Sequence, residues 1–510
     1  MEMLKNRRAI YRAVLLVTLL LYLWLAACIP YTHDDWEWGL PRGLRHFLAA
    51  DLNSRYMGNL VEILLTRSPL LKTLVMGLVF TALPAAAAAL GCFCAGLRGE
   101  EALRVKLPAF LLGNLLLLSL RLDIWRETYA WVAGFSNYVA SALLLLAYHR
   151  LLLDGEEEKT GLPRLLAAYL AGVAVQLFLE DLTIYVLLCT LLALLLRRLR
   201  REAIPRSLWA LLIGNVLGTA LMFSSGLYGV LFHTGSAIDS YRELTFDPHA
   251  GIFAILSRLI RLFLVLFPPA IWVTSWTFSI AVLLLLACLA LRRRPGRLSA
   301  WIAALNGLLT VYLVYVRFRG RIQLPSLWWS NILDAGMGLL IFLAALGEML
   351  LLFDGQPQLR RRALLFWCSA PVVTLPLAAV TYEMGTRFFL TPDIMLMETA
   401  LLLLAELLRE RPKRAALTAL LCALGACALF VHLAPIYGGI GAAARERERL
   451  IRQTQTGESE RLILPAFPGG GKYLHHPDPG EGSAYVQNFR AFYGIPEGVE
   501  LRFESWEDPA

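Results

Sequence analysis

Four ionisable side chains stand together directly after the first apolar segment of this 510-residue chain. His33, Asp34, Asp35 and Glu37 lie in the stretch Tyr31–Gly39, which reads YTHDDWEWG. Imidazole and carboxylate groups exchange protons in catalysis, so this stretch is a candidate for general acid–base chemistry. A structural alternative stays open, in which the acidic pair fixes the topology or caps the helix that follows.

Other polar residues at the edges of apolar segments extend this set. They share a predicted position on one side of a membrane and are Arg55, Asn59, Glu127, Asn137, Tyr138, Glu180, Asp181, Arg319, Glu383 and Arg387. Carboxylates mixed with guanidiniums suit an anionic substrate on which an acid–base group acts. As structural alternatives, Glu180 and Asp181 could form a turn that reaches water. Asn137 and Tyr138 could be anchors at the membrane interface.

The elements that must position these residues are apolar segments long enough to cross a bilayer. Hydrophobic residues make up 58% of the chain and charged residues 17%, too few to cover a soluble protein of this length. We therefore predict an all-α polytopic membrane protein with about 13 transmembrane helices. The predicted spans are residues 10–29, 71–96, 107–121, 136–153, 163–179, 182–197, 207–225, 273–291, 298–316, 332–353, 363–380, 394–408 and 415–434.

Basic residues indicate how these spans are oriented. They gather in the short links 97–106, 197–206, 291–298, 353–362 and 409–414. Because Lys and Arg are retained on the cytoplasmic side, we expect a cytoplasmic N-terminus and an extracytoplasmic C-terminus in the cell membrane. The net charge of +9 then reflects topology, and we expect no nucleic-acid partner.

The outer segments divide the chain into two predicted parts. Residues 1–434 form a transmembrane module whose first outer loop covers 30–70, and residues 435–510 form an extracytoplasmic tail or cap. Residues 256–272 have helical periodicity with arginines, which is typical of a helix in the interface plane. Within the tail, 460–467 reads as a strand, and His475–Asp478 (HHPD) is either a plain loop or a metal cluster.

Four stretches carry a resemblance to a known group of proteins. They are HDDWEWG at 33–39, NSRYMGNLVEILLTRS at 53–68, WVAGFSNYV at 131–139 and LFLEDLTIY at 177–185. Together with an interfacial helix in the first outer loop, they resemble a family of bacterial multi-pass membrane proteins grouped with the GT-C superfamily. GT-C proteins are polytopic glycosyltransferases that use lipid-phosphate-linked sugars. The tail stretch NFRAFYGIPEG at 488–498 is also similar to that family.

The resemblance implies an inverting transfer in which an aspartate of the first outer loop deprotonates the acceptor hydroxyl. That base would be Asp34 or Asp35, and the other carboxylate would orient a partner or a divalent cation such as Mg²⁺ or Mn²⁺. The donor would be a polyprenyl-phosphate-linked sugar and the acceptor a cell-envelope glycan or lipid. The donor phosphate would contact Arg55, Arg319 and Arg387. The acceptor pocket would contain His33, Glu37, Asn59, Glu127, Asn137, Tyr138, Glu180, Asp181 and Glu383.

Three other functions remain open at this stage. A transporter or flippase for lipid-linked or anionic substrates would need polar groups at mid-membrane, where Glu398, Glu406 and Asp334 are the exceptions in nearly uncharged spans. A polysaccharide ligase or polymerase would use the same class of lipid-linked sugar. A non-catalytic scaffold or polysaccharide-binding membrane protein is the third alternative. The chain has no GxxxxGK[ST] phosphate-binding motif, which argues against ATP-driven work by the chain itself. It also has no HExxH motif of zinc-dependent enzymes.

Overall fold

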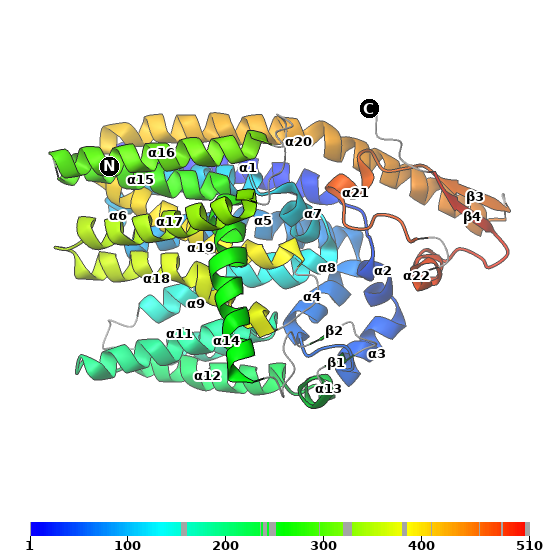
Figure 1. The fold of residues 1–510 in the computed structure, drawn as a ribbon. Helices are drawn as coiled ribbons and strands as arrows, with labels where there is room; N and C mark the ends of the chain where they lie inside the picture. Colours follow the sequence, from blue (N-terminus) through cyan, green and yellow to red (C-terminus); the bar gives the residue numbers. More distant parts are fainter. Residues whose placement is uncertain are drawn as a thin grey trace. The chain divides into compact units, whose positions relative to one another are not determined.

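The computed structural model is almost entirely helical, in agreement with the predicted all-α class (Figure 1). It describes residues 2–154, 161–234, 236–237, 242–243, 251–294, 296–319, 329–379, 385–409, 411–457, 460–480 and 483–504. Internal contacts divide the chain into two compact units. Unit 1 consists of Met1–Arg12, Pro84–Arg121 and Val230–Cys427, and unit 2 consists of Ala13–Leu83, Leu122–Gly229 and Ala428–Ala510.

The described residues contain ten helices that are long and apolar enough to cross a membrane, or up to eleven if one bent pair counts as a span. The bent pair is α6 (Gly99–Leu118) with α7 (Leu122–Thr128), which meet at 96°. The structure is therefore that of a multi-pass membrane protein, but the count of about 13 is not confirmed. Three predicted spans fall short, because α10 (Leu162–Gln176) has 15 residues, and α12 (Arg206–Met222) and α18 (Pro357–Val373) have 17 each.

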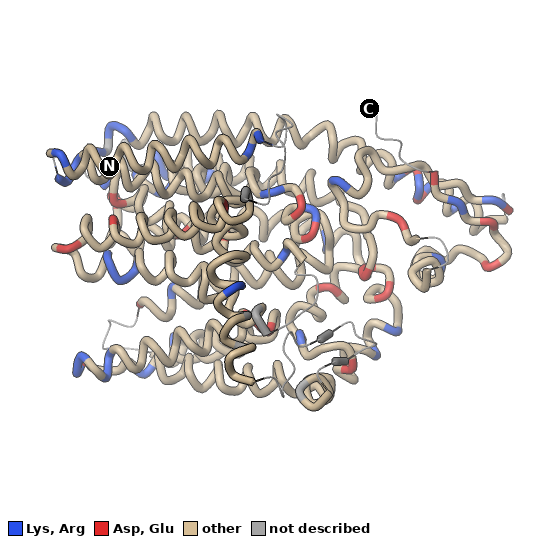
Figure 2. Tube along the Cα trace, in the orientation of Figure 1, with Lys and Arg blue, Asp and Glu red and all other residues tan. Residues whose placement is uncertain are grey.

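Unit 1 is built around α19 (Leu390–Arg409), which is buried along nearly its whole length. It packs against α6, α15 (Trp276–Arg293) and α18 (Pro357–Val373). α16 (Arg297–Arg319) and α17 (Trp329–Leu352) pack in turn on α15. The shorter elements of this unit are β1 (Ser236–Ala237), β2 (Arg242–Glu243), η4 (Leu375–Ala379) and η5 (Thr386–Phe389). The basic ends of α15 and α18 lie at the same end of this bundle, as expected if both links face the cytoplasm (Figure 2).

The helix α14 (Ile252–Arg261) continues through η2 (Leu262–Leu266) and η3 (Pro269–Val273). Residues Ile252–Val273 are long enough to span a membrane. In Figure 1, however, α14 runs across the direction of α15 to α18 within the same unit. The placement of α14 in the interface plane stays a prediction.

Unit 2 holds the first loop and the tail. Its elements include α2 (Asp34–Gly39), α3 (Pro41–Ala49), α4 (Tyr56–Thr66), α8 (Val132–Gly134), η1 (Phe135–Val139), α9 (Ala140–Leu153) and α11 (Glu180–Leu199). α1 (Glu2–Cys28), α5 (Pro69–Cys94), α13 (Gly226–Thr234) and α20 (Pro412–Gln455) contribute residues to both units. Close packing of α10 on α12 depends on glycine: a Cβ on Gly214 would lie 2.3 Å from the carbonyl oxygen of Tyr169.

The tail continues the last span without a break. α20 has 44 residues and runs past the predicted span end at 434, with Pro435 inside it. It is followed by β3 (Arg461–Leu464), α21 (Gly470–Tyr473), α22 (Ala484–Tyr493) and β4 (Glu500–Phe503). β3 falls within the strand predicted at 460–467, and it pairs in parallel with β4. A small core joins the tail to the first loop and consists of Trp36, Ile451, Leu462, Leu464, Phe489, Ile495 and Val499.

Candidate active site in the first loop

The two adjacent aspartates of the first loop have opposite environments. Both belong to α2, a helix of 6 residues, and neighbouring helical residues point about 100° apart. The side chain of Asp35 is fully buried, whereas that of Asp34 is 37% exposed. Only Asp34 is therefore open to a molecule that approaches from solvent.

Both oxygens of Asp35 accept backbone hydrogen bonds. The N–H of Thr32 donates to Oδ2 at 2.8 Å, as in the return bond of a capping box, and the N–H of Ala133 donates to Oδ1 at 2.9 Å. Burial raises the pKa of Asp35 to about 7, although the two N–H donors act in the opposite direction. Asp35 thus joins α2 to the start of α8, across 98 residues of sequence.

Asp34 has an imidazole and a phenol beside it. His33 Nδ1 lies 2.8 Å from Asp34 Oδ1, and the hydroxyl of Tyr485 donates to the same oxygen at 3.4 Å. His33 has a φ of +52°, a left-handed conformation that a residue with a Cβ rarely adopts. The packing around His33 must offset this strain, and such strain is often found at functional sites.

That packing is a cluster of rings supplied largely by the tail. The ring of His33 stacks on Tyr485 with centroids 4.4 Å apart, and it lies 4.9 Å from His476 and 5.2 Å from His475. The ring of Trp131 lies 4.2 Å from His475. The HHPD stretch is therefore a loop whose histidines contact the first loop. The sequence did not reveal this contact, because the two partners are more than 400 residues apart.

Charged residues of α7 complete this side of the site. Burial lowers the pKa of His476, with His33 and Arg126 adding to the effect, while Asp34 and Glu127 oppose it. His476 therefore lies near side chains of both signs of charge. Arg126 Nη1 donates to the carbonyl of Gly471 at 2.7 Å, and its Nε is buried with no hydrogen-bond partner among the described residues.

A polar face of α4 extends the site inward. Arg55, Asn59 and Glu62 are spaced four and three residues apart, which puts them on one side of that helix. Asn59 Nδ2 donates to Asn53 Oδ1 at 2.9 Å. Glu62 is only 1% exposed, and its Oε1 has no hydrogen-bond partner in the described part of the chain. Burial raises the pKa of Glu62 well above its usual value, and the carboxylates of Asp35 and Asp34 add to the rise.

Glu62 was not among the site residues predicted from the sequence. Its helical spacing from Arg55 and Asn59 is the pattern that would have indicated it.

At the far end of this face, Arg55 and Glu180 form an ion pair. Arg55 Nε and Nη2 donate to Glu180 Oε2 at 2.9 and 2.7 Å. The hydroxyl of Tyr228 donates to the other oxygen, Glu180 Oε1, at 2.8 Å. Asp181 is the next residue and is buried. Glu180 is therefore held by three donors, so it is a fixed part of the wall of this site.

Asn137 and Tyr138 lie in η1 and are both buried. Asn137 Nδ2 donates to the carbonyl of Ala133 at 3.0 Å, while its Oδ1 has no hydrogen-bond partner within the described residues. A Cβ on Gly58 of α4 would lie 2.1 Å from that Oδ1. A side chain larger than that of glycine at this position would therefore displace the Asn137 amide.

Glu37 lies on the side of α2 that faces the tail and α3. Its carboxylate is 3.1 Å from Arg42 Nε and 3.3 Å from His46 Nε2, and it accepts a hydrogen bond from Asn488 Nδ2 at 3.3 Å. Because these partners already hold it, Glu37 connects α2, α3 and α22 in the structure.

Two of the three remaining predicted residues belong to the other unit. Arg319 and Arg387 belong to unit 1, where Arg319 forms a two-pronged pair with Asp334 at 3.0 and 2.6 Å. The guanidinium of Arg387 lies over the ring of Phe388 at 5.7 Å. Glu383 lies outside the described residues. Unit 2 therefore brings together the predicted residues of the first loop, α7, η1 and α11.

Comparison of the chain with protein-family models, with curated proteins and with solved structures finds no match. The GT-C resemblance thus stays a prediction.

The donor set does not fit a resident metal ion. No group of three or more His, Cys, Asp or Glu side chains among the described residues is arranged to hold one. Asp35 also directs both oxygens at backbone N–H groups, which leaves it poorly suited as a ligand. The reaction proposed for this site therefore contains no step at a divalent cation.

Proposed function

We propose that this protein is a membrane glycosyltransferase with Asp34 as its general base. It would move a sugar from a polyprenyl-phosphate-linked donor to a cell-envelope acceptor on the extracytoplasmic face. The observation that carries the proposal is the contrast within the acidic pair: Asp34 is partly exposed beside an imidazole, and Asp35 is buried and fully bonded.

In the proposed reaction, the carboxylate of Asp34 takes the proton of the acceptor hydroxyl. The acceptor oxygen attacks the anomeric carbon of the sugar from the face opposite the phosphate, and the bond from that carbon to the phosphate oxygen breaks. Polyprenyl phosphate leaves with the electron pair, and the configuration at the anomeric carbon inverts. His33 and Tyr485 are suited to orient Asp34 for this step, since both approach its Oδ1.

The leaving phosphate needs a cation to stabilise its charge. Within unit 2, we assign this role to Arg126, because its Nε is a buried donor with no partner in the described residues and it lies close to His476. Arg55 is a weaker candidate for direct contact, since Glu180 already takes two of its donors. We propose that Arg55 instead fixes the wall between α4 and α11.

The test is transfer by the purified, reconstituted protein from a polyprenyl-phosphate sugar. Asp34→Asn should lower the transfer rate by about 100-fold or more, as expected on loss of a general base. Asp51→Asn is the matched control, because Asp51 is an exposed carboxylate of the same loop that contacts His46. Transfer by Asp34→Asn at the wild-type rate would overturn the assignment.

A transporter remains the second candidate, and one observation favours it. Glu398 of α19 is fully buried, and neither of its carboxylate oxygens has a hydrogen-bond partner among the residues described. An unpartnered acid within a membrane span is typical of proton or ion pathways. Uptake of a lipid-linked or anionic substrate into liposomes, lost in Glu398→Gln and kept in Asp34→Asn, would favour transport over transfer.

A further inference from the structure

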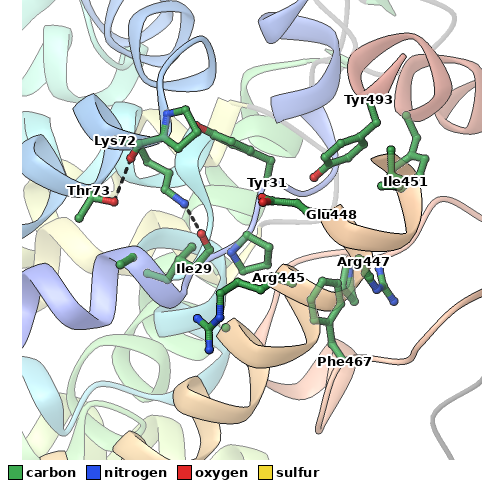
Figure 3. Close-up of a pocket in the computed structure, with 17 residues that line it drawn as sticks. Ile29, Tyr31, Lys72, Thr73, Arg445, Arg447, Glu448, Ile451, Phe467 and Tyr493 are labelled. Carbon is green, nitrogen blue, oxygen red and sulfur yellow. Dashed lines mark hydrogen bonds between the residues drawn. The ribbon is translucent and has the colours of Figure 1, made fainter. Parts of the chain in front are cut away.

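A small pocket opens where the tail meets the ends of the membrane helices in unit 2 (Figure 3). It has a volume of about 100 Å³. Its walls come from the end of α1, the first turn of α5, the outer part of α20, and tail residues that include Phe467 and Tyr493. Because α1 and α5 are apolar spans that end here, the pocket lies at the predicted level of lipid headgroups.

Lys72 provides a buried cation at this pocket. It lies in the first turn of α5 and is 5% exposed. Its ammonium donates to the carbonyl of Ile29 and lies 4.8 Å from the ring centroid of Tyr31 (Figure 3). These contacts use part of the donor capacity of an ammonium group, which can make three hydrogen bonds. A buried lysine with remaining donors favours an anion in the adjoining space.

Two arginines of α20 add positive charge to the lining. Arg445 is exposed, and Arg447 is 5% exposed. Arg447 pairs with Asp478 at 2.5 Å and donates to the carbonyl of Pro465, but its Nη2 is buried with no hydrogen-bond partner in the described residues. Glu448 is the one carboxylate among the lining residues, set against three cations. The pocket therefore keeps a net positive charge and an unused buried donor.

An apolar surface continues from the pocket along the membrane helices. Leu70, Leu74 and Leu78 recur at every fourth residue of α5 and are 70%, 42% and 53% exposed. On α1, Leu20 and Trp24 are 58% and 40% exposed. α1 packs directly on α5, since a Cβ on Gly77 would lie 2.6 Å from Leu23 Cδ2. These exposed faces are those expected to contact acyl chains.

We propose that this pocket binds the phosphate headgroup of an anionic membrane phospholipid, whose acyl chains lie along α1 and α5. A phosphate oxygen accepts the hydrogen bonds that Lys72, Arg445 and Arg447 can donate, and the chains need the apolar surface directly below. The bound lipid would tie the tail to the bilayer at the base of the first loop. This inference is independent of the proposed transferase activity.

The test uses nanodiscs that contain equal amounts of phosphatidylglycerol and phosphatidylcholine, with retained lipid measured by native mass spectrometry. The wild type should retain phosphatidylglycerol in preference to phosphatidylcholine. Arg445→Gln should lower this preference by about fivefold, since a cation near a membrane surface contributes roughly that factor. Lys72→Met should lower it similarly. Because Lys72 is buried and its loss could impair folding, the exposed Arg445 is the decisive variant.

Arg502→Gln is the matched control, because Arg502 is an exposed tail arginine outside the pocket lining. It should keep the wild-type preference. Equal retention in Arg445→Gln and the wild type would overturn the proposal. Displacement of the lipid by millimolar inorganic phosphate would also overturn it, since it would show a site for a free anion. Displacement by an equal amount of polyprenyl phosphate would make the pocket a donor site instead.

Discussion

The burial of Asp35 leads to a prediction about how stability depends on pH. Its pKa is raised from the usual value of 3.8 to about 7 in the folded protein. Between these values the folded state holds a proton that the unfolded state has lost. The stabilisation is therefore complete below pH 4 and is lost as the pH rises through about 7.

The size of the effect follows from the same shift. A change of one pKa unit corresponds to about 1.4 kcal/mol, so Asp35 should lower the free energy of unfolding by about 2 to 3 kcal/mol between pH 5 and pH 8. In Asp35→Asn the side chain cannot ionise, so the free energy of unfolding should lack this part of its dependence on pH. Glu62 also has a raised pKa, so the measured quantity is the difference in slope between wild type and Asp35→Asn.

The assay is equilibrium unfolding of the purified protein in mixed micelles at pH 5, 6, 7 and 8. Asp51→Asn, which removes a half-exposed carboxylate from the same loop, is the matched control. If Asp35→Asn and the wild type have parallel pH profiles, then Asp35 is not a buried acid in the folded protein. The separate roles given to Asp34 and Asp35 would then be refuted.

Three further changes test the walls of the site. Gly58→Ala should displace Asn137 and abolish transfer, while Gly226→Ala, where a Cβ has open space, should keep both the folded yield on size exclusion and the activity. Glu180→Gln should lower the unfolding free energy by about 1.5 to 3 kcal/mol in the same micelle assay, through its hydrogen bonds to Arg55, and an unchanged value would argue that this pair is not formed. Phe489→Ala should cost about 3 to 5 kcal/mol of tail packing against Trp36 and expose α22 to amide exchange, and unaltered exchange there would contradict the docked tail.

Much of the fold could be predicted from the sequence, because a membrane-spanning helix needs about 20 apolar residues and these are visible as blocks. The number of spans could not, because hydropathy does not show where a helix ends. α10 and α12 end after 15 and 17 residues, and α20 continues for 44 residues through Pro435. Each of these endings depends on packing that a local pattern does not contain.

The candidate site was predicted only in part, for a similar reason. Residues next to one another in sequence, such as His33 and Asp34, were found because their chemistry is visible locally. The contacts of His33 with Tyr485 and His476 join distant parts of the chain, so no spacing rule reveals them. Arg319 was predicted in the same set, but its partner is Asp334 of unit 1, fifteen residues away. A shared side of the membrane is therefore weaker evidence than a shared contact.

In the proposed reaction, the acidic pair would meet two opposing requirements of a general base in a loop. A base has to be open to its substrate, yet it must also be held in one orientation, since small displacements reduce the rate strongly. A single residue cannot be both exposed and anchored by burial. Because α2 turns its residues about 100° apart, Asp35 can point inward to the N–H of Ala133 while Asp34 points toward His33 and Tyr485. Under the proposed function Asp35 is a positioning residue, because its hydrogen bonds to the N–H groups of Thr32 and Ala133 fix the helix that carries Asp34.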